Sequence, residues 1–178
     1  VMQKVEELEK IIPEYIYGFD DEPLEKVVGD ILKQKEKTLC TAESCTGGYI
    51  SHLITSIPGS SDYFKGGVVA YSNEIKAEIL QVDENLLKEY GAVSQQVVEA
   101  MAINARRLLQ SDFSIAVSGI AGPDGGTPQK PVGYVWIAVA DAQTCKSEVF
   151  HFGNQRMQNI QRTALSALNL IRLMLIYP

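Results

Sequence analysis

In the sequence Thr38-Leu-Cys-Thr-Ala-Glu-Ser-Cys-Thr-Gly-Gly48, a short apolar run passes through small polar residues directly into a helical pattern, which indicates the fold class. Residues 38–42 predict a buried β-strand, and the apolar spacing of residues 46–56 predicts a helix. A strand followed at once by a helix is the repeating unit of α/β proteins. Because ligands bind where the strands of such sheets end, this stretch is also the first candidate site.

The same alternation of short apolar runs and helical patterns continues along the chain. Strands are predicted at 38–42, 66–71, 114–118, 134–140 and 147–152, and helices at about 2–12, 23–36, 46–56, 73–80, 83–90, 94–110 and 155–176. We expect Asp21 or Glu22 to start the second helix. The last two strands are too close for a crossover helix and predict an antiparallel hairpin. The expected architecture is therefore a three-layer α/β/α sandwich with a mixed, mostly parallel sheet.

The length of 178 residues corresponds to about one domain. We expect residues 1–22 to form an N-terminal helix and an aromatic connector, and residues 23–178 to form the domain itself. Pro13 ends the first helical pattern, and the connector is expected to dock on the domain. Because the chain begins with Val1, we expect it to be a piece of a longer polypeptide with a separate upstream domain.

Composition narrows the class of protein. Sixteen basic and 22 acidic residues give a net charge of −6, which argues against nucleic acid or an anionic membrane as a partner. No apolar run is long enough for a membrane span, and no signal peptide is apparent, so a cytoplasmic location is expected. The three cysteines, Cys40, Cys45 and Cys145, indicate neither a disulfide framework nor a zinc site. We expect no metal and no cofactor.

Glu43, Ser44 and Cys45 place three reactive groups in a row where the first strand ends. The spacing of the glycines that follow fits neither the Walker motif nor the dinucleotide-binding motif. Ser44 or Thr46 could be a simple N-cap of the following helix, or Ser44 or Cys45 could be a nucleophile. The residues alone leave these alternatives open.

A serine nucleophile needs a base within hydrogen-bonding distance. His52 would point away from Ser44 along its helix, and His151 lies in an edge-like strand, so a Ser-His-acid triad is not expected. Tyr71 ends a strand and Lys76 lies early in the next helix, so both could reach the same crevice. An enclosed lysine with a lowered pKa can act as a neutral base, although Lys76 could equally be a solvated helix charge.

The segment 119–132 is a long loop with four glycines, three prolines and Asp124. Long ordered loops are usually functional, and the sequence before and after this loop indicates chain that is held at both ends. The alternative is a disordered surface excursion.

Taken together, several motifs resemble the C-terminal domain family of CinA proteins, in unbroken order over about residues 24–176. The motifs are Thr41-Ala-Glu-Ser-Cys-Thr-Gly-Gly48, Pro58-Gly-Ser-Ser61, Val69-Ala-Tyr-Ser-Asn-Glu-Ile-Lys76, Gly91-Ala-Val-Ser94, Ser118-Gly-Ile-Ala-Gly-Pro-Asp-Gly-Gly126 and Lys130-Pro-Val-Gly133. The resemblance implies a nicotinamide-nucleotide amidase, which hydrolyses nicotinamide mononucleotide to nicotinate mononucleotide and ammonia in pyridine nucleotide salvage.

The resemblance also implies roles for individual residues. Ser44 would be the nucleophile, Tyr71 and Lys76 would handle its proton, and Ser61 would be a further polar member of the site. Arg156 would bind the substrate phosphate. Contacts to the substrate would come from the helix start and from the loop that closes over the ribose phosphate: Thr46, Gly47, Gly48, Gly119, Gly122, Asp124, Gly125 and Gly126.

Two other functions stay open at this point. The domain could bind a nucleotide without catalysis, or it could be a regulatory domain of a two-domain CinA-like protein. The expected partners are a small-molecule substrate and a second copy of the chain, as a homodimer.

Overall fold

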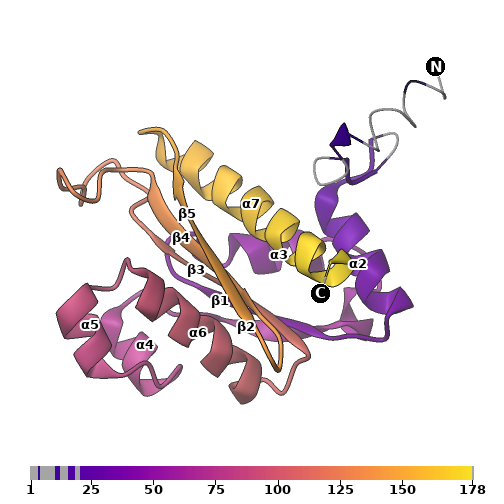
Figure 1. Cartoon of the computed structure of the whole chain (residues 1–178), viewed down its shortest axis with the longest axis horizontal. Helices are drawn as coiled ribbons and strands as arrows, with labels where there is room; N and C mark the ends of the chain where they lie inside the picture. Colours follow the sequence, from indigo (N-terminus) through magenta and orange to yellow (C-terminus); the bar gives the residue numbers. More distant parts are fainter. Residues whose placement is uncertain (1–3, 5–10, 13–15, 19–20, 178) are drawn as a thin grey trace.

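A five-stranded sheet with the order β2-β1-β3-β4-β5 forms the centre of the protein (Figure 1). The structure is a computed structural model, and it describes residues 4, 11–12, 16–18 and 21–177. The strands are β1 (Leu39–Glu43), β2 (Phe64–Val69), β3 (Phe113–Gly119), β4 (Tyr134–Ala140) and β5 (Cys145–His151). The helices are α2 (Leu24–Gln34), α3 (Tyr49–Thr55), α4 (Asn73–Glu78), α5 (Glu84–Tyr90), α6 (Gln95–Leu108) and α7 (Arg156–Ile176), with a short 3₁₀ helix, η1, at Ser60–Asp62.

Helices cover both faces of this sheet. Figure 1 shows α2, α3 and α7 on one side and α4, α5 and α6 on the other. Each face has its own cluster of buried apolar side chains, as the period of two along a strand requires: on β3, Ile115 and Val117 belong to the α7 side and Ala116 belongs to the α6 side. The predicted three-layer α/β/α architecture is confirmed.

The pairing of the strands corrects one part of the expectation. β1 pairs in parallel with β2 and with β3, whereas β3 pairs antiparallel with β4, and β4 pairs antiparallel with β5. The hairpin of β4 and β5 was predicted, but the sheet is half antiparallel rather than mostly parallel. The reason is that the segment 120–133 contains no helix, and a parallel return normally requires a crossover helix.

Small side chains let α6 approach the sheet closely. Ala102 and Ala105 of α6 are fully buried, and they face a cluster that includes Ala116 and Ala138 of the sheet. The opposite cluster contains larger side chains, among them Leu168 and Ile171 of α7. Because β1 and β3 are parallel, the loops that follow them lie at one edge of the sheet.

Element boundaries differ from the predicted ones where turns intervene. The helix predicted from residue 46 begins only at Tyr49, because Gly48 has a φ of 97° and is the N-cap. Pro23, rather than Asp21 or Glu22, is the N-cap of α2. β5 begins at Cys145, two residues before the predicted start, because Asp141 closes a tight turn by accepting hydrogen bonds from the N–H groups of residues 143 and 144.

Most of the predicted helix at 2–12 and part of the predicted connector lie outside the described residues. Within the connector, the carbonyl of Ile16 accepts a hydrogen bond from Nη1 of the buried Arg172 on α7, at 3.4 Å. The division of the chain at residue 22 stays a prediction. None of the helices in the described part of the chain has the length and apolarity needed to cross a membrane.

Candidate active site

A cavity of about 200 Å³ opens where β1 and β3 end. It is formed by the turn after β1, the segment that enters α4, the connection between α5 and α6, the end of β3 and the start of α7. Its lining residues are Ser44, Cys45, Tyr71, Asn73, Lys76, Ala92, Val93, Ser118, Gly119, Ala121 and Arg156. Five of the predicted site residues therefore meet at one place, although they are distant in sequence: Ser44, Tyr71, Lys76, Gly119 and Arg156.

Glu43 organises the turn that carries Ser44. Its buried carboxylate accepts hydrogen bonds from the hydroxyls of Thr46 (2.7 Å) and Ser51 (2.6 Å). It also accepts from the N–H groups of Gly48 (3.1 Å), Ile50 (3.0 Å) and Ser51 (2.8 Å). The carboxylate therefore satisfies the donors at the start of α3, which would otherwise have no partner.

This arrangement corrects the expected substrate contacts at the helix start. The hydroxyl of Thr46 and the N–H of Gly48 are both used by Glu43, so they are not available to an anionic ligand. Gly47 has a φ of 62°, and its contribution is the shape of the turn rather than a contact in the cavity.

Ser44 and Lys76 are in direct contact in the cavity. The Nζ of Lys76 donates hydrogen bonds to Ser44 Oγ at 3.1 Å and to the carbonyl oxygen of Ala70 at 2.8 Å. Both side chains are buried: Lys76 is 1% exposed and Ser44 is 8% exposed. Of the two alternatives for Lys76, a solvated helix charge is wrong, because the amine points inward.

Burial lowers the pKa of Lys76 below its ordinary value of 10.5. The Cys45 thiol and the carboxylate of Glu74 raise the pKa, but their effect is smaller than that of burial. None of the described carboxylates lies within ion-pair distance of this amine. An amine that lacks a carboxylate partner and is removed from water loses its proton more easily, which is what a general base requires.

Tyr71 and Arg156 are joined at the mouth of the cavity. The Nη2 of Arg156 donates to the hydroxyl oxygen of Tyr71 at 3.1 Å, and its Nη1 donates to the carbonyl of Gly122 at 2.8 Å. Tyr71 is 60% exposed, so its ring forms part of the rim of the cavity. Because its oxygen accepts the bond from Arg156, the proton of this hydroxyl is left to donate elsewhere.

The long loop of residues 119–132, the glycine-rich loop, reaches the cavity only through its first residues. Gly119 and Ala121 line the cavity, and Gly122 contributes its carbonyl to Arg156. At Gly119 a side chain would collide with Val135, because a Cβ would lie 2.6 Å from that residue. The remaining predicted contacts, Asp124, Gly125 and Gly126, are exposed and lie outside the lining. The structure does not bring these three residues to Ser44.

Ser61 lies at the wrong end of the sheet for the role expected of it. It is an exposed residue of η1, which precedes β2, and β2 starts beside Leu39 at the beginning of β1. Ser44 follows the opposite end of β1. With about 3.3 Å of rise per residue, the strand separates the two serines by roughly 15 Å. Ser61 is therefore not part of this cavity.

The other nucleophiles and bases considered in the sequence lie apart from Ser44 or are inert. His52 and His151 are exposed, and neither lines the cavity. Cys45 lines the cavity, but burial raises the pKa of its thiol to about 12, which keeps it protonated and a poor nucleophile. The described residues contain no group of three or more His, Cys, Asp or Glu side chains placed to hold a metal ion.

Sequence reasoning missed several residues that shape the site. No role was predicted for four residues that line the cavity, although all of them lie within the quoted motifs: Asn73, Ala92, Val93 and Ser118. Asn159 was detectable as a polar residue on the apolar face of α7: it is 1% exposed, and its Nδ2 donates to the carbonyls of Ala121 and Gly153, both at 2.9 Å.

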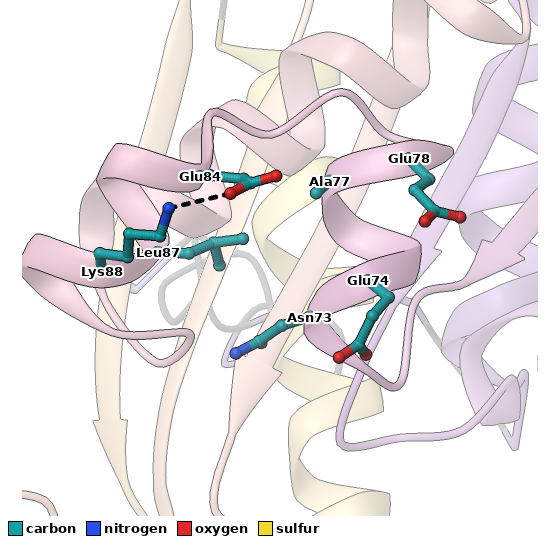
Figure 2. A pocket seen from close by; sticks show the side chains of 7 residues that line it. All are labelled: Asn73, Glu74, Ala77, Glu78, Glu84, Leu87 and Lys88. Carbon is teal, nitrogen blue, oxygen red and sulfur yellow. Dashed lines mark hydrogen bonds and ion pairs between the residues drawn. The ribbon is translucent and has the colours of Figure 1, made fainter.

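A larger groove of about 310 Å³ lies between α4 and α5 (Figure 2). Figure 2 shows Glu74 and Glu78 on one side and the ion pair of Glu84 with Lys88 on the other. Asn73 borders both this groove and the Ser44 cavity. The groove lacks a nucleophile and a buried base, so we place the candidate chemistry in the smaller cavity.

Comparisons with known proteins agree on one family. The sequence model of the CinA C-terminal domain matches residues 21–175. A CinA-like protein of Cytophaga hutchinsonii is 48% identical over 172 residues, which cover 97% of this chain and 41% of that protein. A CinA-like protein of Thermotoga neapolitana is 48% identical over 168 residues, which cover 93% of this chain and 41% of that protein. The chain thus spans about two fifths of the length of these relatives.

A solved structure agrees with the fold. The competence/damage inducible protein CihA from Agrobacterium tumefaciens matches with a TM-score of 0.84 and 34% sequence identity, covering 89% of this chain and 98% of that one. Most of the described chain therefore has the same architecture as that protein.

Proposed function

The chain belongs to the CinA C-terminal domain family, and from this membership we propose that it hydrolyses the carboxamide of nicotinamide mononucleotide to nicotinate mononucleotide and ammonia. The observation that carries the proposal is the contact between the Nζ of a buried Lys76 and Ser44 Oγ, at 3.1 Å. A hydroxyl beside an amine of lowered pKa is an activated nucleophile, and an amide carbonyl is a substrate for it.

In the first half of the reaction, neutral Lys76 takes the proton of Ser44 Oγ as this oxygen attacks the carboxamide carbon. The C–N bond of the tetrahedral intermediate then breaks, and the nitrogen leaves as ammonia after it receives a proton from the Lys76 ammonium. Tyr71 lines the same cavity, and its free hydroxyl proton can donate to the substrate while its oxygen accepts from Arg156. The product of this half is an ester between Ser44 and the nicotinoyl group.

In the second half, a water molecule attacks the ester carbon and gives its proton to Lys76. The bond from this carbon to Ser44 Oγ breaks, the proton returns to the serine, and nicotinate mononucleotide leaves. Lys76 thus acts as base and acid in turn, which requires a pKa near the working pH. Burial lowers the pKa of Lys76 from its ordinary value of 10.5, which is a change toward the working pH.

The size of the cavity supports a substrate that enters only in part. A volume of about 200 Å³ is below the range of roughly 300–1,000 Å³ that holds a whole drug-sized ligand. We propose that the pyridine ring and its carboxamide enter the cavity and that the ribose phosphate lies at the mouth. Arg156 is exposed there, and its bonds to Gly122 and Tyr71 use two of the five N–H donors of its guanidinium.

Release of ammonia from nicotinamide mononucleotide tests this proposal directly. The unaltered protein is expected to release one ammonia per nucleotide, and Ser44→Ala is expected to release none above the uncatalysed rate. Nucleotide binding without ammonia release would instead support a non-catalytic nucleotide-binding domain. If the nucleotide neither binds nor reacts, a regulatory domain becomes the better assignment. The homodimer, the cytoplasmic location and the role in pyridine nucleotide salvage stay predictions.

A further inference from the structure

Both ends of the glycine-rich loop are tied to the connection between α5 and α6. Lys130, at the far end of the loop, donates from Nζ to the carbonyls of Tyr90 (3.0 Å) and Val93 (2.7 Å). Ser118, just before the loop, donates from Oγ to the carbonyl of Ala92 at 2.7 Å. Three of the four carbonyls from residue 90 to residue 93 are thus held by side chains that flank one loop.

These contacts join two walls of the Ser44 cavity. Ala92 and Val93 form part of its lining on one side, and Gly119 and Ala121 form part of it on the other. Lys130 itself does not line the cavity. Any effect of this lysine on a ligand in the cavity must therefore pass through the segments that it holds.

The chemistry of Lys130 also indicates a geometric role. Within the described residues, no carboxylate lies within ion-pair distance of its amine. Its bonds go to backbone carbonyls, and Tyr90 is the last residue of α5, where a positive charge is favourable. Two charge-assisted bonds at 2.7 and 3.0 Å place the loop end relative to residues 90–93.

We propose that Lys130 is a positioning residue for substrate binding, which holds the wall of Ala92 and Val93 against the glycine-rich loop so that the Ser44 cavity keeps its shape. Only the expected effect of Lys130 on kinetics rests on the proposed function. Without the two Lys130 bonds, which we call the latch, only the Ser118 bond to Ala92 would tie the walls, and the ring of a substrate would be held less firmly between them.

A direct contact of Lys130 with the substrate phosphate is the alternative, and a second substrate distinguishes the two. Nicotinamide riboside has the same ring and carboxamide but lacks the phosphate. A latch that shapes the ring cavity affects the nucleotide and the riboside equally. A phosphate contact affects the nucleotide alone.

The experiment compares Lys130→Met, Lys130→Arg and the unaltered protein, with Lys88→Met as the control on exposed α5. For Lys130→Met we expect kcat/KM to fall about 10- to 100-fold on both substrates, mostly through KM. Lys130→Arg should recover most of the loss, because a guanidinium can also donate to two carbonyls. Lys88→Met should change neither value. A loss confined to the nucleotide, or no loss on either substrate, would overturn the proposal.

Hydrogen exchange tests the latch without any assumption about activity. In or next to the two tied segments, the N–H groups of Gly91, Ile120, Thr127 and Gly133 donate to the backbone carbonyls of Leu87, Tyr134, Lys130 and Ile120, respectively. Their exchange should become faster in Lys130→Met and stay unchanged in Lys88→Met. If the unaltered protein releases no ammonia, the proposed function fails and this measurement alone decides the latch. Unchanged exchange in Lys130→Met would show that the latch is absent.

Discussion

The Nζ of Lys76 lies 3.1 Å from the Oγ of Ser44, although the two residues are 32 positions apart in the chain. Ser44 follows the end of β1, and Lys76 comes from α4, which begins shortly after the neighbouring β2. The parallel pairing of these two strands brings both ends to the same edge of the sheet. The pair is buried, and this burial lowers the pKa of the amine.

Ammonia release should depend on pH through Lys76. Because burial lowers its pKa below 10.5, kcat/KM is expected to rise with pH until the amine has lost its proton, and to level off above that lowered pKa. In Lys76→Arg the rise should disappear together with the activity, because a guanidinium stays protonated. A profile that falls as pH increases through this range would show that the charged amine is the active form.

Removal of the Lys76 amine should lower the activity without lowering the stability of the protein. In Lys76→Met we expect kcat to fall about 10²- to 10⁴-fold, while the melting temperature at neutral pH does not decrease, because an apolar side chain of similar length replaces a buried amine that has no carboxylate partner. The folded state of the unaltered protein binds the proton of Lys76 less tightly than the unfolded state does. Its stability relative to Lys76→Met should therefore increase with pH between the lowered pKa and 10.5. Thermal melts of both proteins across this range measure the difference.

Glu43 should be important for stability as well as for the position of Ser44. Its carboxylate accepts five hydrogen bonds inside the protein, and the amide of Glu43→Gln would place an NH₂ group against some of these donors. We expect the free energy of unfolding to fall by about 1.5–3 kcal/mol. Glu84→Gln, at an exposed position, should change it by less than about 0.5 kcal/mol. Equal urea midpoints for the two variants would contradict this view of the turn.

Replacement of Arg156 should raise the KM for nicotinamide mononucleotide more than the KM for nicotinamide riboside. If its free donors bind the phosphate, Arg156→Met is expected to raise KM about 10- to 100-fold for the nucleotide and much less for the riboside. Some loss of kcat on both substrates should accompany it, because Tyr71 and the Gly122 carbonyl lose the donor that they share. Steady-state kinetics on the two substrates measure the effect on KM and the effect on kcat separately. An equal change in KM for both substrates would show that Arg156 does not bind the phosphate.

Cys45 should be a bystander in the reaction. Burial raises the pKa of its thiol to about 12, so at pH 8 the thiol is protonated and enclosed. Cys45→Ala is expected to keep most of its turnover, and iodoacetamide should leave Cys45 unmodified in the folded protein. A loss of activity as large as that of Ser44→Ala would instead assign the nucleophile to sulfur.

Local sequence patterns were sufficient for the elements and for part of the site. The alternation of strand and helix signals predicted the three layers, and the short link after β4 predicted the hairpin with β5. Ser44 could be placed at a strand end, and Lys76 near a helix start, because both positions follow from local periodicity. These features depend on neighbours within a few residues, which the sequence displays directly.

Which distant groups meet, and which donors remain free, depends on the packing of segments far apart in the chain. The antiparallel return of β4 beside β3 depends on a loop without local periodicity, so the sequence suggested too many parallel pairs. Glu43 takes the donors of Thr46 and Gly48 because its buried carboxylate has to be satisfied, and this competition is invisible in a linear motif. Ser61 and Ser44 belong to one set of motifs, but the length of β1 separates them. The order and direction of the strands determine which strand ends lie at the same edge of the sheet.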